Sequence, residues 1–161
     1  MIWEILKKIQ FRELWRLTVL CVKHPLYVIP TINASKRCIA ICNDLLGNTH
    51  HLHNPANAFR HAFWNVLIVS YCARRNKKTP RALAWAKRIT DWHEEFSVNE
   101  SLDRAMDLHN NKIGRLLAKD LFAQNEQKMI ETVKKSMKNT KKVTKLKEIA
   151  QYKAQLVYLV E

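Results

Sequence analysis

The segment NAFRHAFWN (57–65) places amides, a guanidinium and an imidazole among residues that a helix would normally bury. Asn57, His61 and Asn65 are four residues apart, so on a helix they lie along one face, with Arg60 beside them. An apolar core can satisfy one buried histidine, but two amides and a guanidinium are more than it easily accommodates. This face is therefore a candidate functional surface.

A second segment, TDWHEEF (90–96), supplies an imidazole and carboxylates. His93 and Glu94 are adjacent, so on a helix they point about 100° apart and do not both face one ion. The segment lacks the second histidine of the HExxH zinc motif, whose two histidines converge on one metal. Glu94 is still a candidate metal ligand, and His93 a candidate general base.

A third segment, MDLHNNKIGR (106–115), brings Asp107, Asn110 and Asn111 to one helical face by their i, i+3, i+4 spacing. Gly114 inside a helix costs about 1 kcal/mol relative to Ala, which indicates a close approach of backbone or ligand there. Arg115 can pair with a carboxylate or phosphate through two hydrogen bonds. The alternative is that Asp107 and Asn111 only hydrogen-bond neighbouring helices together.

Together the three segments predict a site for a divalent cation, because mixed imidazole, carboxylate and amide ligands suit Mg²⁺, Ca²⁺, Mn²⁺ or Zn²⁺. Such an ion polarises a phosphoryl or acyl oxygen and lowers the pKa of bound water. His61 or His93 would act as general base, and Arg60 and Arg115 would neutralise developing charge. The predicted ligands are His61, Glu94, Asp107 and Asn111, and the predicted supporting residues are Asn57, Asn65 and Asn110. Without a metal, a pair of His61 with a carboxylate would activate water directly.

Three long helices are expected to carry these residues. Asn54 and Pro55 are typical of the N-cap and first position of a helix, here over about 55–75. Thr79 and Pro80 repeat the signal for a helix over about 80–96. Ser97 and Glu100 have the spacing of a capping box, for a helix over about 100–122.

The flanking segments are amphipathic and basic. Residues 2–22 have apolar residues at helical spacing with Lys and Arg between them, and with Trp3 and Trp15 this helix could lie on a membrane. Docking on the protein's own core is the slightly favoured alternative. Prolines at 25 and 30 are expected to end that helix, and a short helix is expected over 33–46, ended by Gly47. The three histidines of the loop NTHHLHN (48–54) could bind a metal, but a solvated loop is the favoured expectation.

Residues 126–148 hold eight lysines against three glutamates, and helical spacing continues beyond them. We expect a pair of basic helices packed on the core. The start of the chain shows neither a signal peptide nor an apolar run long enough to span a membrane. We therefore expect a protein that is cytoplasmic when made, and either peripheral to a membrane or exported by a route that needs no signal peptide.

Composition predicts the fold class. The chain has 161 residues, 47% of them hydrophobic, with only 2 Gly and 4 Pro. It is long enough for one buried core and poor in turn formers, which favours an all-α, single-domain bundle of about five to seven helices with a basic amphipathic N-terminal helix. Within this single domain (1–161), residues 1–30 form the amphipathic segment, 31–122 the core with the polar site, and 123–161 the basic C-terminal part. The cysteines at 21, 38, 42 and 72 form no CxxC pair and are expected to be core thiols.

The net charge is +14, from 28 Lys+Arg against 14 Asp+Glu, which favours a polyanionic partner. An anionic lipid surface and a nucleic acid both fit that charge. We expect a hydrolase of a phosphoester, metal-assisted, with a membrane phospholipid narrowly favoured because the sequence shows no nucleic-acid motif with interleaved aromatic residues. A nuclease, a non-enzymatic basic binding module and a membrane-perturbing toxin remain as alternatives.

The order of the three polar blocks also resembles a known family. Asn-Ala-Phe-Arg-His-Ala at 57–62, His-Glu at 93–94 and Met-Asp-Leu-His-Asn-Asn-x-x-Gly-Arg at 106–115 resemble the signature of an uncharacterised family of small helical bacterial domains. Such domains often lie at the ends of large secreted, toxin-like proteins. The resemblance covers about 55–116 and implies a shared polar site on these blocks, a bacterial effector context and a cognate immunity protein as partner. In this sequence the domain makes up nearly all of the residues, a departure from that setting that makes the toxin interpretation a weaker expectation.

Overall fold

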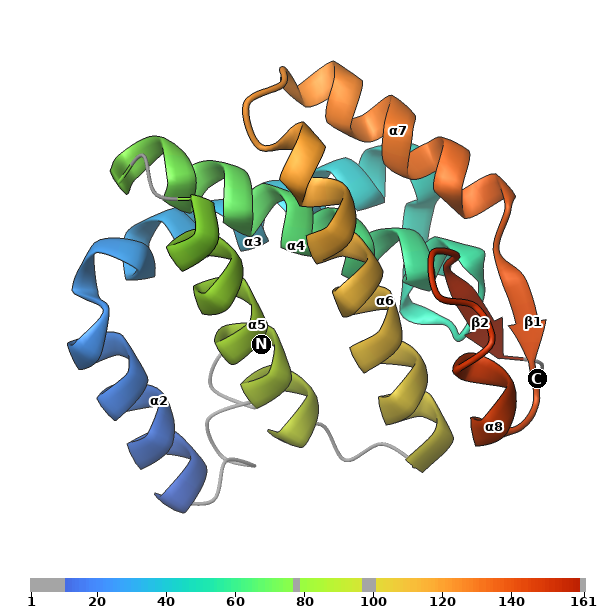
Figure 1. Ribbon diagram of the computed structural model, residues 1–161, viewed down its shortest axis with the longest axis horizontal. Helices are drawn as coiled ribbons and strands as arrows, with labels where there is room; N and C mark the ends of the chain where they lie inside the picture. The colour runs from blue at the N-terminus through green and yellow to red at the C-terminus, as the bar shows by residue number, and fades with distance from the viewer. Residues whose placement is uncertain (1–10, 77–78, 97–100, 160–161) are drawn as a thin grey trace.

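The computed structural model describes residues 11–76, 79–96 and 101–159. Within them the chain is almost entirely helical, as expected for an all-α bundle (Figure 1). The elements in order are α2 (Phe11–Lys23), α3 (Pro25–Leu46), the 3₁₀ helix η1 (Gly47–His51), α4 (Pro55–Asn76), α5 (Thr79–Phe96), α6 (Ser101–Leu121), α7 (Glu126–Lys138), β1 (Lys141–Val143), α8 (Leu146–Ile149) and β2 (Val157–Leu159).

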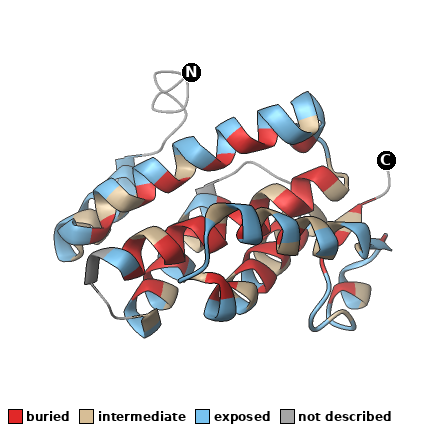
Figure 2. Ribbon diagram, turned by 90° about the horizontal axis from the view of Figure 1, so that it is seen from above, coloured by how far each residue is buried: buried red, intermediate tan, exposed pale blue. Residues whose placement is uncertain are grey.

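Helix α4 is the centre of the bundle, in contact with α3, α5, α6 and α7. Its side chains are buried on more than one side, and Phe59, Phe63 and Leu67 have no exposed surface. Figure 2 shows the buried residues on the sides of the helices that face one another. A helix surrounded in this way has little solvent-exposed surface, so its buried polar residues Asn57, His61 and Asn65 must find partners inside the protein.

The start of α4 is capped as the sequence predicts. The side-chain oxygen of Asn54 accepts hydrogen bonds from the backbone N–H of Ala56 at 2.9 Å and of Asn57 at 3.1 Å. Pro55, which has no N–H to satisfy, occupies the first helical position. The predicted helices over 80–96 and 100–122 are confirmed as α5 and α6, whereas the capping box at Ser97 and Glu100 lies outside the described residues.

The region before Gly47 differs from the prediction, because α3 begins at Pro25 and continues through Pro30. A proline inside a helix removes one hydrogen bond and costs about 3 kcal/mol. Tyr27, Thr31 and Ala34 around it are buried against the core, and this packing outweighs that cost. The end of the helix at Gly47 is confirmed, with a φ of 58° that suits glycine.

The C-terminal part also differs from the expected pair of basic helices. Only α7 is a helix of some length; after it, β1 and β2 form a two-stranded parallel sheet joined by the short α8. Lys141 pairs with Val157 and Val143 with Leu159 in this sheet. The run LVYLV is rich in residues that favour strands, and this was the sequence signal for β2.

Helix α2 packs loosely on the rest of the protein. None of its residues is fully buried, although Leu17 and Leu20 pack partly against the core. Trp92 donates a hydrogen bond to the backbone oxygen of Glu13 at 3.2 Å, and Arg16 forms a 2.8 Å ion pair with Glu95. The core docking expected for the N-terminal helix is therefore only partial; the expected residues 2–10 lie outside the described part.

The cysteine prediction is confirmed in that Cys38, Cys42 and Cys72 are buried free thiols, while Cys21 is partly exposed. Among the described residues, no helix is long and apolar enough to cross a membrane.

Candidate metal centre between three helices

The three acid and imidazole groups predicted as metal ligands meet between α4, α5 and α6. His61, Glu94 and Asp107 are 3%, 1% and 4% exposed. The Nδ1 atom of His61 lies 3.4 Å from Oε1 of Glu94, and its Nε2 atom lies 3.2 Å from Oδ1 of Asp107. One donor atom from each residue lies within 4.8 Å of the others, a spacing that could hold a metal ion.

The hydrogen bonds around His61 leave one contact of Asp107 unexplained. A guanidinium nitrogen of Arg60 lies 2.9 Å from Nε2 of His61. Because a guanidinium only donates, Nε2 must accept this bond, and the ring proton then sits on Nδ1, toward Glu94. Nε2 thus has no proton for Oδ1 of Asp107, and this buried oxygen has no hydrogen-bond partner. A proton on Asp107 or a cation beside it would resolve the contact.

Burial and neighbouring groups shift the pKa values of the two carboxyl groups, Asp107 and Glu94, in opposite directions. Burial raises the pKa of Asp107 to about 6, with the charge of Glu94 adding to the rise and His61 opposing it. Burial also raises the pKa of Glu94, but hydrogen bonds and charge from His61, together with His93 and Asn111, outweigh it and hold that pKa below its usual value. Glu94 is therefore ionised at neutral pH, whereas Asp107 titrates close to it.

This pKa predicts a pH dependence of stability in the metal-free protein. The folded pKa of Asp107, about 6, is above its unfolded value of 3.8, so the folded state holds the proton more tightly. That stabilisation is complete below pH ~4 and is lost as the pH rises through ~6, a change of about 3 kcal/mol at 1.36 kcal/mol per pKa unit. Urea unfolding across this range should show the loss in the wild type and not in Asp107→Asn. Parallel profiles of the two proteins would contradict the prediction.

The two amides of the site form a hydrogen-bond network of their own. Nδ2 of Asn65 donates to Oδ1 of Asn111 at 2.7 Å, and Nδ2 of Asn111 donates to Oε1 of Glu94 at 2.9 Å. The side-chain oxygen of Asn111 thus accepts a hydrogen bond from Asn65, and its side-chain nitrogen orients Glu94. Metal binding by Asn111 stays a prediction.

Arg115 also belongs to this network. Its guanidinium donates to Oδ1 of Asn65 and to the hydroxyl of Thr90, both at 3.1 Å, and burial lowers its pKa. In the structure Arg115 links α6 to α4 and α5 through these two hydrogen bonds, and its role in neutralising charge during a reaction stays a prediction. Thr90, which completes this link, was not singled out from the sequence, since a lone threonine in a helix carries no signal.

The other two predicted supporting residues, Asn110 and Asn57, have different surroundings. Asn110 turns away from the site and pairs with the backbone of Val157 in both directions, at 2.9 and 3.0 Å, so it holds β2 against α6. Asn57 is buried on the same helix as His61, and its side-chain oxygen has no hydrogen-bond partner. With Oδ1 of Asp107 on α6, it is the second buried side-chain acceptor among the predicted site residues that has no hydrogen-bond partner.

A pocket of about 410 Å³ gives access to the site and is lined by Ser35, Cys38, Ile39, Arg60, His61, Trp64 and His93. His93 is exposed here and packs edge-on against Trp64, with ring centroids 5.2 Å apart. The groups packed around its ring still shield the imidazole from part of the solvent, and this desolvation lowers the pKa of His93, which keeps the ring neutral and able to accept a proton. Sequence reasoning missed the wall from α3, because no pattern in the sequence pairs α3 with the face of α4.

The comparison with protein families gives one match. A family model described as "Domain of unknown function (DUF6973)" matches residues 18–141, a stretch that includes all three polar segments. No curated protein and no solved structure matches the chain.

Proposed function

Since the chain belongs to the family described as Domain of unknown function (DUF6973), we propose its function from the site's geometry: a metal-assisted hydrolase of a phosphoester. The observation that carries the proposal is the buried cluster of His61, Glu94 and Asp107, in which an oxygen of Asp107 faces an imidazole nitrogen without a shared proton. A divalent cation between these groups would satisfy that oxygen and offset the cost of burying two carboxylates. Imidazole with two carboxylates suits Zn²⁺ or Mn²⁺ better than the all-oxygen preference of Mg²⁺ or Ca²⁺.

The pocket supplies the remaining groups that hydrolysis needs. A cation held there would polarise the phosphoryl oxygen and make water more acidic. The water oxygen would bond to phosphorus, the P–O bond to the alcohol would break, and the alcohol would leave with the proton that water gave up. His93, neutral at the pocket wall, takes the proton from water, and Arg60 neutralises the developing negative charge.

The pocket lining supports a phospholipid as the substrate class. Cys38, Ile39 and Trp64 form an apolar wall beside the guanidinium of Arg60. An apolar chain next to a phosphate matches this arrangement, because each part meets a surface of its own polarity. A nucleotide would fill the pocket with a polar sugar and base instead.

The test is hydrolysis with and without metal. We expect the wild type to hydrolyse a soluble phosphodiester such as bis(p-nitrophenyl) phosphate, to lose this activity in chelator, and to recover it with Zn²⁺ or Mn²⁺. His61→Ala should lose activity at least about a hundredfold, since it removes a ligand and the group that Arg60 contacts. Phospholipid vesicles, assayed for released headgroup, test the substrate class.

The matched control is His109→Ala, because His109 contacts the backbone oxygen of Gln155 at 2.8 Å and does not line the pocket. It should retain wild-type activity. Full activity in chelator, or in a folded His61→Ala variant, would contradict the proposal. The competing function is a structural one, in which the polar cluster only holds the helices together; the hydrogen-bond network of Asn65, Thr90 and Arg115 favours it. In that case His61→Ala would lower stability, and no hydrolysis would be found.

A further inference from the structure

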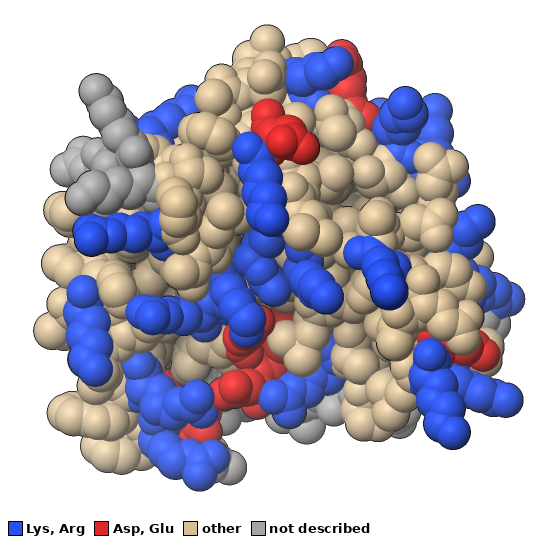
Figure 3. Space-filling model, in the orientation of Figure 1, with Lys and Arg blue, Asp and Glu red and all other residues tan. Residues whose placement is uncertain are grey.

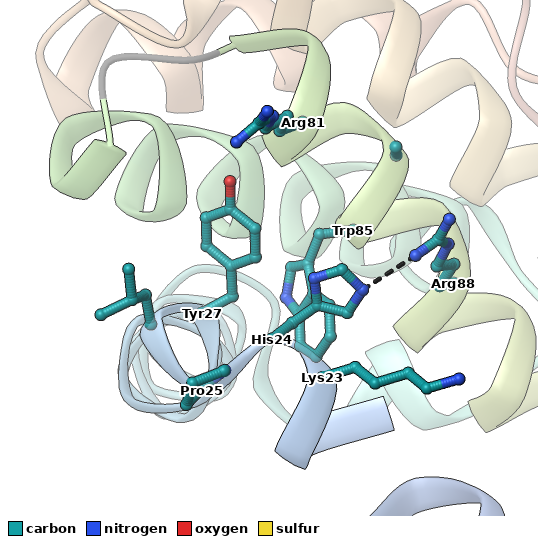
Figure 4. Close-up of a pocket in the computed structure, with 9 residues that line it drawn as sticks. Lys23, His24, Pro25, Tyr27, Arg81, Trp85 and Arg88 are labelled. Atoms are coloured by element: carbon teal, nitrogen blue, oxygen red, sulfur yellow. Dashed lines mark hydrogen bonds between the residues drawn. The ribbon is translucent and has the colours of Figure 1, made fainter. Parts of the chain in front are cut away.

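A second pocket, which shares no lining residue with the pocket at His61, lies where α2 and α3 meet and face α5. It has a volume of about 460 Å³, and Lys23, His24, Tyr27, Arg81, Trp85 and Arg88 are among its lining residues (Figure 4). Tyr27 and Trp85 are almost fully buried, with ring centroids 5.7 Å apart, and His24 packs on both rings. The aromatic groups therefore form a fixed floor under the charged side chains.

Three cations surround this floor without a carboxylate partner. Among the described residues, no salt bridge involves Lys23, Arg81 or Arg88. In Figure 4 the Tyr27 hydroxyl points toward the side of Arg81, while Lys23 and Arg88 extend to the other side of the pocket. Like charges gathered around one hollow repel each other, and an anion in that hollow offsets the repulsion.

His24 orients one of these cations. A guanidinium nitrogen of Arg88 donates to Nε2 of His24 at 2.8 Å. Burial lowers the pKa of His24, and the charges of Arg88 and Lys23 lower it further, so the imidazole stays neutral and accepts this bond. The remaining N–H groups of Arg88 are then held in a fixed direction, which is what binding a phosphate through two hydrogen bonds requires.

An exposed apolar surface continues from the pocket onto α2. Phe11, Trp15 and Val22 are 82%, 60% and 73% exposed, and their spacing places them on one side of the helix. Trp15 lines a neighbouring hollow that also includes Lys23, His24 and Arg88. Leu26, at the pocket itself, is 54% exposed. Large apolar side chains beside a cationic pocket mark a surface for a partner that is both anionic and apolar.

We propose that this pocket binds the phosphate group of an anionic phospholipid, while the exposed side chains of α2 enter the bilayer interface. Tryptophan and basic residues on one amphipathic helix suit the boundary between headgroups and acyl chains. Lys and Arg are distributed over the face in Figure 3 and do not form one continuous track, as a nucleic-acid backbone would need. This docking does not depend on hydrolysis, whereas the choice of a lipid substrate at the His61 site is strengthened by it.

The experiment is co-sedimentation with vesicles of phosphatidylcholine alone or mixed equally with phosphatidylglycerol. We expect the wild type to bind the mixed vesicles and not those of phosphatidylcholine. The triple variant Lys23→Gln, Arg81→Gln, Arg88→Gln should bind roughly a hundredfold more weakly, since each basic residue near an anionic surface contributes about fivefold. All three side chains are exposed, so the variant should fold normally.

A matched control removes the same charge elsewhere. Lys128→Gln, Lys135→Gln, Lys142→Gln changes three exposed lysines on α7 and β1, at the opposite end of the bundle from α2 (Figure 1). Binding should stay within about twofold of the wild type, because charges beyond a Debye length from the bilayer are screened. An equal loss in both triple variants would mean attraction by net charge alone and would overturn the proposal.

Two further comparisons test the apolar contact with the bilayer and the binding of other phosphate-containing ligands. Trp15→Ala should weaken vesicle binding several-fold, whereas Leu146→Ala, at another exposed apolar residue, should leave it unchanged. Binding of glycerol phosphate or duplex DNA, but not of vesicles, would overturn the docking surface. His61→Ala should bind vesicles like the wild type, and the triple variant of the pocket should still hydrolyse a soluble phosphodiester, so each proposal can fail without the other.

Discussion

An Asp107→Asn variant is expected to lose metal binding and hydrolysis while remaining as stable as the wild type or becoming more stable. Asparagine matches the shape of aspartate but carries no charge to hold a cation. Because neighbours of a metal ligand already contribute 10- to 100-fold, losing a ligand should cost at least about a hundredfold in metal affinity. At neutral pH the substitution also removes a carboxylate whose pKa burial has raised to about 6.

Calorimetric titration with Zn²⁺ or Mn²⁺, hydrolysis rates and urea unfolding together test this prediction. Asp103→Asn is the matched control, since Asp103 precedes Asp107 by one turn of α6 and makes only a 3.7 Å contact with His53. It should leave metal affinity unchanged. If Asp107→Asn instead unfolds the protein and leaves the metal affinity of its folded fraction intact, Asp107 is structural and the proposed function is wrong.

A Gly114→Ala variant is expected to be strongly destabilised, although alanine favours helices. A Cβ atom at this position would lie 2.4 Å from the backbone oxygen of Ala62 and 2.6 Å from its Cα. Neither atom can move aside alone, so α4 and α6 would have to separate. We expect a net loss of about 2–3 kcal/mol, from overpacking that exceeds the roughly 1 kcal/mol gained in helix propensity.

The same variant should lose metal affinity, because His61 precedes Ala62 on α4 and Asp107 lies on α6 with Gly114. Thermal unfolding and metal titration measure the two effects. Lys112→Ala, at an exposed position of the same helix, is the control and should change stability by less than about 0.5 kcal/mol. A Gly114→Ala protein more stable than the wild type would show that the two helices are not in this close contact.

The sequence predicted the central helices because their ends carry local signals. Asn54 with Pro55, and Thr79 with Pro80, mark helix starts through the backbone groups that they satisfy or lack. Gly114 was also interpretable, since a glycine inside a helix has few local reasons to be there. Such signals depend on neighbouring residues only, and neighbouring residues are what a sequence displays.

The failures come from tertiary contacts that override local preference. Pro30 does not break α3, since buried residues on both sides of it hold the helix to the core. For Val157 the local signal of LVYLV does favour a strand, and Asn110 of α6 adds two hydrogen bonds to its backbone. The site shows the same limit. The helical faces predicted that His61, Glu94 and Asp107 meet, but only the packed structure shows that the side-chain oxygen of Asn111 accepts a hydrogen bond from Asn65.

The three ligand groups of the proposed metal centre also link the ion to the stability of the whole chain. They come from α4, α5 and α6, so no single segment of the chain carries the complete site. An ion with appreciable affinity for these groups would bind the native state and hardly the unfolded one. By mass action it would then stabilise the folded protein reversibly. At a free ion concentration of a hundred times its dissociation constant, it would add about 2.7 kcal/mol to the free energy of unfolding. With the ion bound, α4, α5 and α6 would thus unfold together, although they are separate segments of the chain.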